Sequence, residues 1–419
     1  MASESSAADT KKKRTTNEAP GTNEQLLSNA ERKKKAKEEK AARRAAAKSA
    51  PPQQAQQQQT TTTTTANEQP RSAVGSTTRT RVRLDGASTP RPQVPECFSH
   101  LSMARRLAIT QADKDVHPTV LALGQYMGCF AVGDSITRLE ATLLAFKKVI
   151  DSYTTPHGAT FSRHFTSHVL NPQIDYLAAC RPMCFSMGNA IRWLKLQISK
   201  LDIDLPDSEA KKHLRDLIDS FISERITLAD FVIVKTAAEM VSEGDVVVVY
   251  GRHHLVERAL LKARSQGRRF KVVVVDDAFE RVGIDLAKVL AKADVAVTYM
   301  SDLGALRTTL SRATLVMAAA EAMFSNGAMY ARAGTCDVAT VAADLGLRVV
   351  ALCESINFTE RVAIDSLTYN EIDPESCHAE GFRLLFDTTM HRYISVVVTE
   401  LGTTSAKSVP AILRKVEEL

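Results

Sequence analysis

Five short polar segments follow apolar runs of strand length, and they are the places where this sequence could do chemistry. They read Gly251-Arg252-His253-His254, Asp276-Asp277, Ser301-Asp302, and the stretches 321–327 and 354–361. In a doubly wound parallel sheet, ligands bind outside the carboxyl ends of the strands, which is where all these segments would lie. The sequence therefore predicts that any binding site lies along this one edge of a sheet.

The turn at Gly251 and Arg252 has two interpretations. A helix that begins after Gly251 would offer free backbone N–H groups to an anion, and Arg252 would add a positive charge. The sequence has neither GxGxxG nor GxxxxGK[ST], the glycine-rich patterns of nucleotide sites. A turn glycine beside a solvated arginine explains the residues equally well.

The acidic and imidazole groups predict no reaction. Asp276-Asp277 could supply a general base, but neighbours at a strand end point in opposite directions, so one of them is expected to cap the next helix. His253 and His254 have no Cys or carboxylate partner at metal-ligand spacing, and the CRPMC motif at 180–184 has no second pair to complete a zinc site. Chain order alone assembles no Ser/His/Asp set. We expect no catalytic residue, no metal and no cofactor.

Two sequence patterns predict the elements that position these segments. From about residue 96 to residue 242, apolar side chains recur at helical spacing after the N-cap candidates Asp134, Ser186 and Ser208, which predicts five or six helices. From Gly244 onward, β-branched runs alternate with helical patterns, as in a parallel sheet covered on both faces. The fold class is therefore α/β, with a helical domain followed by a Rossmann-like parallel sheet domain.

The sheet domain can be divided into elements. Strands are predicted near 246–250, 271–275, 294–298, 314–318 and 348–353. Helices are predicted near 254–265, 282–291, 303–311 and 334–345. The predicted domains are 1–93 for an N-terminal extension, 94–242 for the helical domain and 243–419 for the sheet domain.

The extension explains most of the chain's charge. Of a net charge of +6, residues 1–93 carry 18 Lys and Arg against 9 Asp and Glu, and the rest carries 36 against 39. With its Gln and Thr runs it has almost no apolar surface to bury, so we expect disorder, apart from a transient helix near 29–48. Its basic runs could contact RNA, although a solvated tail explains them more simply. Seven scattered cysteines and no signal-like segment favour a soluble, intracellular protein in a reducing compartment.

Motifs across residues 96–414 resemble those of the regulatory subunits of eukaryotic translation initiation factor 2B. The matching pieces are YTTP at 153–156, CRP and SMGNAI within 180–191, GDVVVVYGRHHLVERAL at 244–260, SNGAMYARAGT at 325–335, CESINFTERVAIDS at 353–366, TYNEID at 368–373, TELG at 399–402 and KSVPAILR at 407–414. YTTP, SVPAILR and the long basic extension are typical of the delta members rather than of alpha or beta. One departure is DDAFERVGID at 276–285, where the family commonly has a loop that contains Gly-Arg.

The resemblance also implies a comparison with enzymes of the same fold. Isomerases that act on methylthioribose phosphate or ribose bisphosphate use a Cys after the first strand and an Asp after an Asn-Gly pair. Gly251 and Ala328 stand at those two positions here. Neither can act as an acid or a base, so isomerase activity is the less favoured alternative. The degenerate pocket would comprise Gly251, Arg252, Asp276, Asn326, Gly327 and Ala328.

The family's assembly is a two-fold symmetric decamer of alpha, beta, delta, gamma and epsilon subunits, in the cytoplasm and without membrane contact. The resemblance implies that this chain pairs with beta through its sheet domain, with Phe358, Arg361, Ile394 and Val398 as interface candidates. It also implies that the helical domain faces the alpha subunit of initiation factor 2 and senses its phosphorylation. Possible contributors are Arg181, Arg192 and Arg225, for which ordinary solvated or capping roles are the simpler interpretation. A non-catalytic regulatory subunit is the favoured function, ahead of an isomerase or an RNA-binding protein.

Overall fold

The computed structural model describes residues 94, 96–107, 114–375 and 381–417. The chain separates into one unit over residues 1–86 and a second over residues 87–419, and the description below concerns the second. The predicted extension over 1–93, with its helix near 29–48, lies outside the described residues. None of the described helices combines the length and the apolar character that crossing a bilayer requires.

Helices form nearly all of the described chain between residues 118 and 239. They are α2 (Pro118–Gly128), α3 (Ser135–Ser152), α4 (Phe161–His164), α5 (Asn171–Cys180), α6 (Phe185–Lys200), α7 (Asp207–Ile222) and α8 (Ala229–Glu239). A π-helical segment over Phe165–Leu170 joins α4 to α5, and another over Ser223–Leu228 joins α7 to α8. This stretch therefore contains five continuous helical segments, as predicted.

The predicted start of α3 is confirmed, and two other predicted starts were wrong by two residues. Asp134 caps α3, because its Oδ2 accepts a hydrogen bond from the backbone N–H of Thr137. Ser186 and Ser208 lie instead in the first turns of their helices, after the N-cap residues Cys184 and Pro206. The fixed φ of Pro206 suits the residue that precedes a helix. The helix α7 therefore begins earlier in the chain than predicted.

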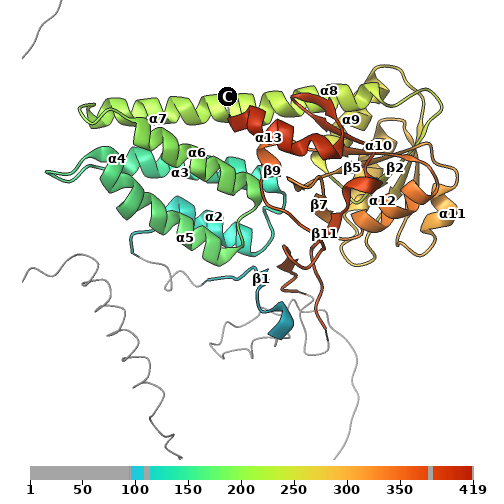
Figure 1. Ribbon diagram of the computed structural model, residues 1–419, viewed down its shortest axis with the longest axis horizontal. Coiled ribbons are helices and arrows are strands. Elements are labelled where there is room, and N and C mark those ends of the chain that lie inside the picture. The colour runs from blue at the N-terminus through green and yellow to red at the C-terminus, as the bar shows by residue number, and fades with distance from the viewer. Residues whose placement is uncertain (1–93, 95, 108–113, 376–380, 418–419) are drawn as a thin grey trace, which may run out of the picture. The chain divides into compact units, whose positions relative to one another are not determined.

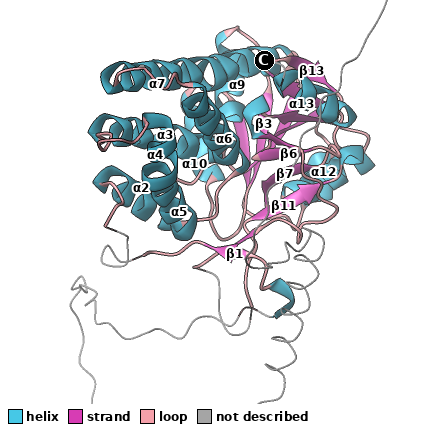
Figure 2. Ribbon diagram, turned by 60° about the vertical axis from the view of Figure 1, so that its left-hand side comes forward, coloured by secondary structure: helices cyan, strands magenta, loops and turns pink. Residues whose placement is uncertain are grey.

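A seven-stranded sheet follows, and Figure 2 shows it beside the grouped helices α2 to α6. Its order is β13-β12-β8-β5-β2-β3-β4, with every pair parallel except β12 and β13. The strands are β2 (Val246–Tyr250), β3 (Lys271–Val275), β4 (Ala296–Met300), β5 (Leu315–Ala319), β8 (Arg348–Leu352), β12 (Val396–Thr399) and β13 (Gly402–Thr404). The helices are α9 (His254–Ser265), α10 (Gly283–Lys292), α11 (Leu306–Leu310), α12 (Thr335–Asp344) and α13 (Val409–Glu417). The α/β fold is confirmed.

Alternate residues of the central strands are buried on opposite faces, which explains their unbroken valine runs. Val247 and Val249 of β2 pack in one core with α8, α9 and α10. Val248 packs in a second core with α11 and α12. In the sheet region, two predicted starts were wrong by more than one residue: β4 begins two residues later than expected, and α11 begins three residues later. The left-handed backbone of Asp294, with φ of 61°, extends the turn after α10.

Short strands that the sequence did not reveal form two smaller sheets. The first has the order β11-β7-β6-β9, and the second pairs β1 with β10 in parallel. Their bounds are β1 (Ser102–Met103), β6 (Ala322–Phe324), β7 (Met329–Arg332), β9 (Phe358–Thr359), β10 (Glu371–Ile372) and β11 (Phe386–Thr389). Most of them are too short to show the alternation by which a strand is recognised. The β1–β10 pair brings the start of the described chain to a point 269 residues later, at the register Ser102 with Glu371.

One continuous helix belongs to both cores. Figure 1 shows α7 and α8 as a single long helix. Leu214 and Ile218 of α7 pack among the other helices. Ile233 and Ala237 of α8 pack instead against the sheet, where α8 contacts α9 and β12. The helical region therefore continues into the core of the sheet, and the division at residue 242 stays a prediction.

A buried ion network joins the helices to the chain after β9. The Nε of Arg181, which follows α5, lies 2.9 Å from Glu371 Oε2 in β10, and Arg138 Nη1 of α3 lies 3.7 Å from Oε1. The two arginines are only 2% exposed. Arg181 also donates to the carbonyl of Gly133, and Arg138 donates to that of Pro182. One carboxylate thus holds two helical segments and β10 together.

Replacing that carboxylate should destabilise the fold strongly. We expect Glu371→Gln to lower the free energy of unfolding by about 3–5 kcal/mol, because it leaves two buried guanidinium groups without a counter-charge. Asp219→Asn is the matched control, since it removes an exposed carboxylate paired with Lys147 and should cost less than about 1 kcal/mol. Chemical denaturation of both variants measures the difference. Equal costs would contradict the account.

Candidate functional site

A cavity of about 850 Å³ lies where the topology predicts a ligand site, at the carboxyl ends of β2 and β5. Gly251 to His254 form one wall, and Ala318 and Ala319 lie beside them. Asp134 of the helical region faces these residues, and Arg332, Thr335 and Phe386 line the other side. The cavity therefore lies between the helices and the sheet, and both supply polar groups to it.

Only part of the predicted pocket lines this cavity. Gly251 and Arg252 do so, and Arg252 is paired with Glu257 at 2.8 Å. Asp276 is buried, and its Oδ2 accepts hydrogen bonds from the N–H of Gly283, at the start of α10, and from Tyr299. Asp276 therefore accepts from the first N–H group of α10, as expected for one residue of the acidic pair, although the N-cap residue itself is Val282.

The Asn326-Gly327-Ala328 turn joins β6 to β7 away from the cavity lining. Gly327 has a φ of +78°, and a Cβ there would collide with the carbonyl of Ala406, so only glycine fits. Ala328 is fully buried among Ala322, Phe324 and Tyr330. The turn thus has a packing role, and Ala328, the position expected from the resemblance to correspond to the isomerases' acid, is enclosed within a core.

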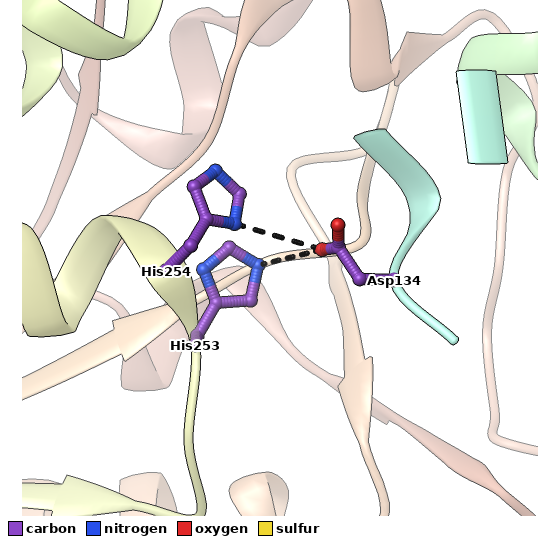
Figure 3. Close-up of side chains that lie close together, drawn as sticks. All are labelled: Asp134, His253 and His254. Atoms are coloured by element: carbon purple, nitrogen blue, oxygen red, sulfur yellow. Dashed lines mark ion pairs between the residues drawn. The ribbon is translucent and has the colours of Figure 1, made fainter. Parts of the chain in front are cut away.

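The side chains of His253 and His254 converge on Asp134, as Figure 3 shows. Asp134 Oδ1 lies 3.9 Å from His253 Nε2 and 3.6 Å from His254 Nδ1. The other nitrogen of His254, Nε2, lies 3.5 Å from Asp230 Oδ2 in α8 and 3.4 Å from Glu354 Oε1 after β8. Carboxylates from three separate parts of the chain, at positions 134, 230 and 354, thus meet at one imidazole. Sequence reasoning missed this cluster, and the adjacent histidines at a strand end were its only local signal.

The cluster shifts the pKa values of its members. Burial disfavours a charged imidazole, but the carboxylates of Asp134, Asp230 and Glu354 outweigh it and raise the pKa of His254 to about 12. Burial and the charge of His254 lower the pKa of His253 to about 3. Burial also acts to raise the pKa of Asp134, yet the two histidines hold it well below its usual value. The surrounding carboxylates therefore stabilise positive charge at the position of His254.

Comparison with known proteins identifies the family. The profile of the Initiation factor 2 subunit family matches residues 132–406. The translation initiation factor eIF2B subunit delta of Schizosaccharomyces pombe is 39% identical over 345 residues, which cover 77% of this chain and 73% of that protein. The chain belongs to the initiation factor 2 subunit family.

Solved and more distant relatives agree with this membership. A chain of the crystal structure of the tetrameric eIF2B-beta2-delta2 complex from C. thermophilum is 55% identical, with a TM-score of 0.71, and the match covers 73% of this chain and 98% of that one. The ribose 1,5-bisphosphate isomerase of Archaeoglobus fulgidus is 23% identical over 237 residues, which cover 54% of this chain and 74% of the enzyme. The family's eIF2B delta members are thus much more similar to this chain than the isomerase is.

The interface candidates predicted from the family resemblance are mostly interior. Phe358, Ile394 and Val398 are buried by the chain's own packing, Phe358 and Ile394 in one core and Val398 in the core beneath α8. Arg361 is exposed, and its guanidinium lies over the rings of Phe185 and Tyr369. A direct role in subunit contact stays a prediction for these four residues, and only Arg361 has an exposed side chain.

The three arginines predicted to contact substrate also differ in how far they are buried. Arg181 is buried and paired with Glu371, so its charge is already used within the chain. Arg192 of α6 is exposed and, with Arg361, lines a second cavity of about 690 Å³. Arg225 is half-buried in the π-helical segment before α8. Arg192 and Arg225 keep their predicted role as candidates, whereas Arg181 is placed as a structural residue.

A further carboxyl group in this family member titrates near neutrality. Asp387 of β11 is buried, and its Oδ2 accepts hydrogen bonds from the N–H groups of Gly334 and Cys336 at the start of α12. Burial raises the pKa of Asp387 from 3.8 to about 7, and these N–H groups only partly oppose it. The folded state therefore binds this proton more tightly than the unfolded state does. Stability from this group is complete at low pH and is lost as the pH rises toward about 7.

Asp387→Asn should remove that pH dependence. The stability difference between the variant and the natural chain should shift in favour of the variant by on the order of 2 kcal/mol as the pH rises from about 5 to about 8. One pKa unit corresponds to about 1.4 kcal/mol. Unfolding measured at both pH values tests this. Asp365→Asn is the control, because the pKa of the exposed Asp365 is lowered by backbone N–H groups and it stays ionised throughout that range. A pH-independent difference for Asp387→Asn would contradict the assignment.

Proposed function

We propose that this chain is the delta-type regulatory subunit of the guanine-nucleotide exchange factor for translation initiation factor 2, and that it does no bond-making chemistry itself. The observation that carries the proposal is the identity of 39% to an eIF2B delta subunit over most of both chains. Pairing with a beta subunit is supported by the relative whose crystal structure is described as a beta2-delta2 tetramer. The alpha, gamma and epsilon subunits complete the proposed complex in the cytoplasm.

The non-catalytic part of the proposal is supported by two positions. Gly251 lines the cavity without a side chain that could transfer a proton, and Ala328 is buried outside its lining. The isomerase alternative is favoured only by the distant enzyme relative and by the ionisable groups that the cavity contains. His254 and Asp134 are paired with each other at the cavity wall. We therefore assign these two side chains a structural role rather than a role in sugar chemistry.

The turn that positions the acid of the isomerases has another use in this chain. Asn326 Nδ2 donates a hydrogen bond of 2.6 Å to the carbonyl of Ala363. Ser325 Oγ donates to the carbonyls of Glu360 and Arg361. The turn thus fixes the loop between β9 and β10, and Glu371 anchors the end of that loop. A loop held at both ends is a suitable support for a contact surface, because little order has to be gained on binding.

The same loop exposes apolar side chains. Val362, Ile364 and Leu367 are exposed by 49%, 72% and 42%, although they lie in a well-anchored segment. Exposed apolar groups close together are typical of protein contact sites. We therefore propose that these three residues, with Arg361, form part of the beta-facing surface. The exposed Arg192 and the half-buried Arg225 are the proposed contacts to the phosphorylated alpha subunit of initiation factor 2, whose phosphate would supply the negative charge.

A single substitution in the loop tests the pairing. We expect Ile364→Asp to lower recovery of the beta subunit with tagged full-length chain at least about tenfold, because a charge would replace an apolar group at the core of the contact. Ile203→Asp is the matched control, since Ile203 is 64% exposed in the turn between α6 and α7 and should leave pairing intact.

The same preparations separate the two functions. The natural chain should not isomerise ribose 1,5-bisphosphate or methylthioribose phosphate above background. Turnover of either sugar would favour the enzyme alternative over the regulatory role. Equal recovery of beta with both variants would contradict the surface assignment and leave the family membership unaffected.

A further inference from the structure

We propose that Asp230, His254 and Glu354 bind one divalent transition-metal ion, with Zn²⁺ as the ion that fits best. The three ligands come from separate elements: Asp230 from α8, His254 from the first residue of α9, and Glu354 from the residue pair that follows β8. Their ligand atoms all lie within 4.8 Å of one another. This inference goes beyond the proposed regulatory function and does not depend on it.

The distances fit coordination better than hydrogen bonding. His254 Nε2 is 3.5 Å from Asp230 Oδ2 and 3.4 Å from Glu354 Oε1. Charge-assisted N–H···O bonds are about 2.7–2.9 Å long, so both separations are too great. Zinc bonds of about 2.0–2.1 Å to nitrogen and about 2.0–2.2 Å to oxygen place tetrahedral ligands about 3.3 Å apart. The two measured separations are close to that edge length.

Two of the three atoms that face one another, His254 Nε2 and Glu354 Oε1, have no other partner in the described part of the chain, whereas Asp230 Oδ2 also accepts a hydrogen bond from Arg258. Among the residues that the structure describes, His254 Nε2, Glu354 Oε1 and Asp230 Oδ1 are buried polar atoms without a hydrogen bond. Glu354 is completely buried, and its Oε1 points at the same imidazole nitrogen that faces Asp230. Leaving a charged oxygen buried and unpaired is costly. A cation bound between His254 Nε2 and Glu354 Oε1 would give both atoms a partner.

Neighbouring groups hold the three ligands in place. Asn357 Nδ2 donates to Glu354 Oε2 at 3.0 Å, and Arg258 Nη1 donates to Asp230 Oδ2 at 2.8 Å. Asp134 faces the Nδ1 of His254, which directs the metal to Nε2. A carboxylate behind a metal-binding histidine is the usual way of fixing its tautomer. His254 also lines the large cavity, so water from the cavity can occupy a fourth position.

The donor set favours zinc over the common hard cations. Imidazole suits zinc and neighbouring transition metals, whereas magnesium and calcium prefer sites made of oxygen alone. One neutral imidazole and two carboxylates balance the charge of a divalent ion. The competing explanation is a protonated His254 that pairs with the same carboxylates and leaves no room for a metal. The two explanations make opposite predictions for metal binding.

Zinc binding to the full-length chain distinguishes them. After removal of metal with a chelator, titration with Zn²⁺ in competition with a coloured chelator should show one tight site per chain, and Co²⁺ should give the visible spectrum of a tetrahedral site. Glu354→Gln should weaken binding at least about 100-fold, and Asp134→Asn, which acts through His254, about 10–100-fold. His253→Asn is the matched control and should bind normally, because it changes the adjacent ring and an Asn can keep the helix cap.

Two results would overturn the proposal. In the first, the natural chain binds Zn²⁺ no better than Glu354→Gln, which would favour the protonated histidine. In the second, His253→Asn and Asp134→Asn lose the metal while Glu354→Gln retains it, which would place the ion in the half-exposed cluster of Asp134, His253 and His254. If Glu354→Gln does not fold, Asp230→Asn replaces it as the test variant. Zn²⁺ should then raise the unfolding temperature of the natural chain but not that of Asp230→Asn. An equal rise in the two proteins would contradict the site.

Discussion

The rest of the structure depends on one buried carboxylate, that of Glu371. It is the negative partner of two guanidinium groups in an interior where an unpaired charge is far more costly than a paired one. Arg138 comes from α3, Arg181 from the end of α5, and Glu371 from the two-residue strand β10. The helices and the chain after β9 must therefore stay together, and so must the walls of the cavity between them.

Under the proposed regulatory role, this constraint would preserve a cavity of the kind found in enzymes without preserving a reaction in it. The cavity is kept open by the packing of helices against the sheet, and its chemistry depends on single side chains that can change without disturbing that packing. By the sequence resemblance, Gly251 and Ala328 are the positions expected to correspond to the isomerases' thiol and acid. In this chain the Asn326 turn holds a loop with exposed apolar residues, because Asn326 donates a hydrogen bond to the carbonyl of Ala363.

The sequence predicted the central sheet well, because valine runs such as 246–249 and 272–275 are typical of parallel strands that are buried on both faces. It did not predict the small sheets, whose strands are mostly too short to show a period. It also failed to distinguish an apolar strand buried within the chain from one covered by a partner, since both have the same pattern. Val398 was therefore proposed for an interface and is found in the core beneath α8. The cluster around His254 was missed because its members meet only in the folded chain.

The central claim is that this chain regulates nucleotide exchange without catalysing it. The most direct test is release of guanine nucleotide from initiation factor 2 by complexes assembled with and without this chain, using substrate whose alpha subunit is either unphosphorylated or phosphorylated. The account predicts that the catalytic subunits alone retain basal release, and that strong inhibition by the phosphorylated substrate appears only when this chain is present. Inhibition of equal strength in its absence, or release catalysed by this chain alone, would contradict the account.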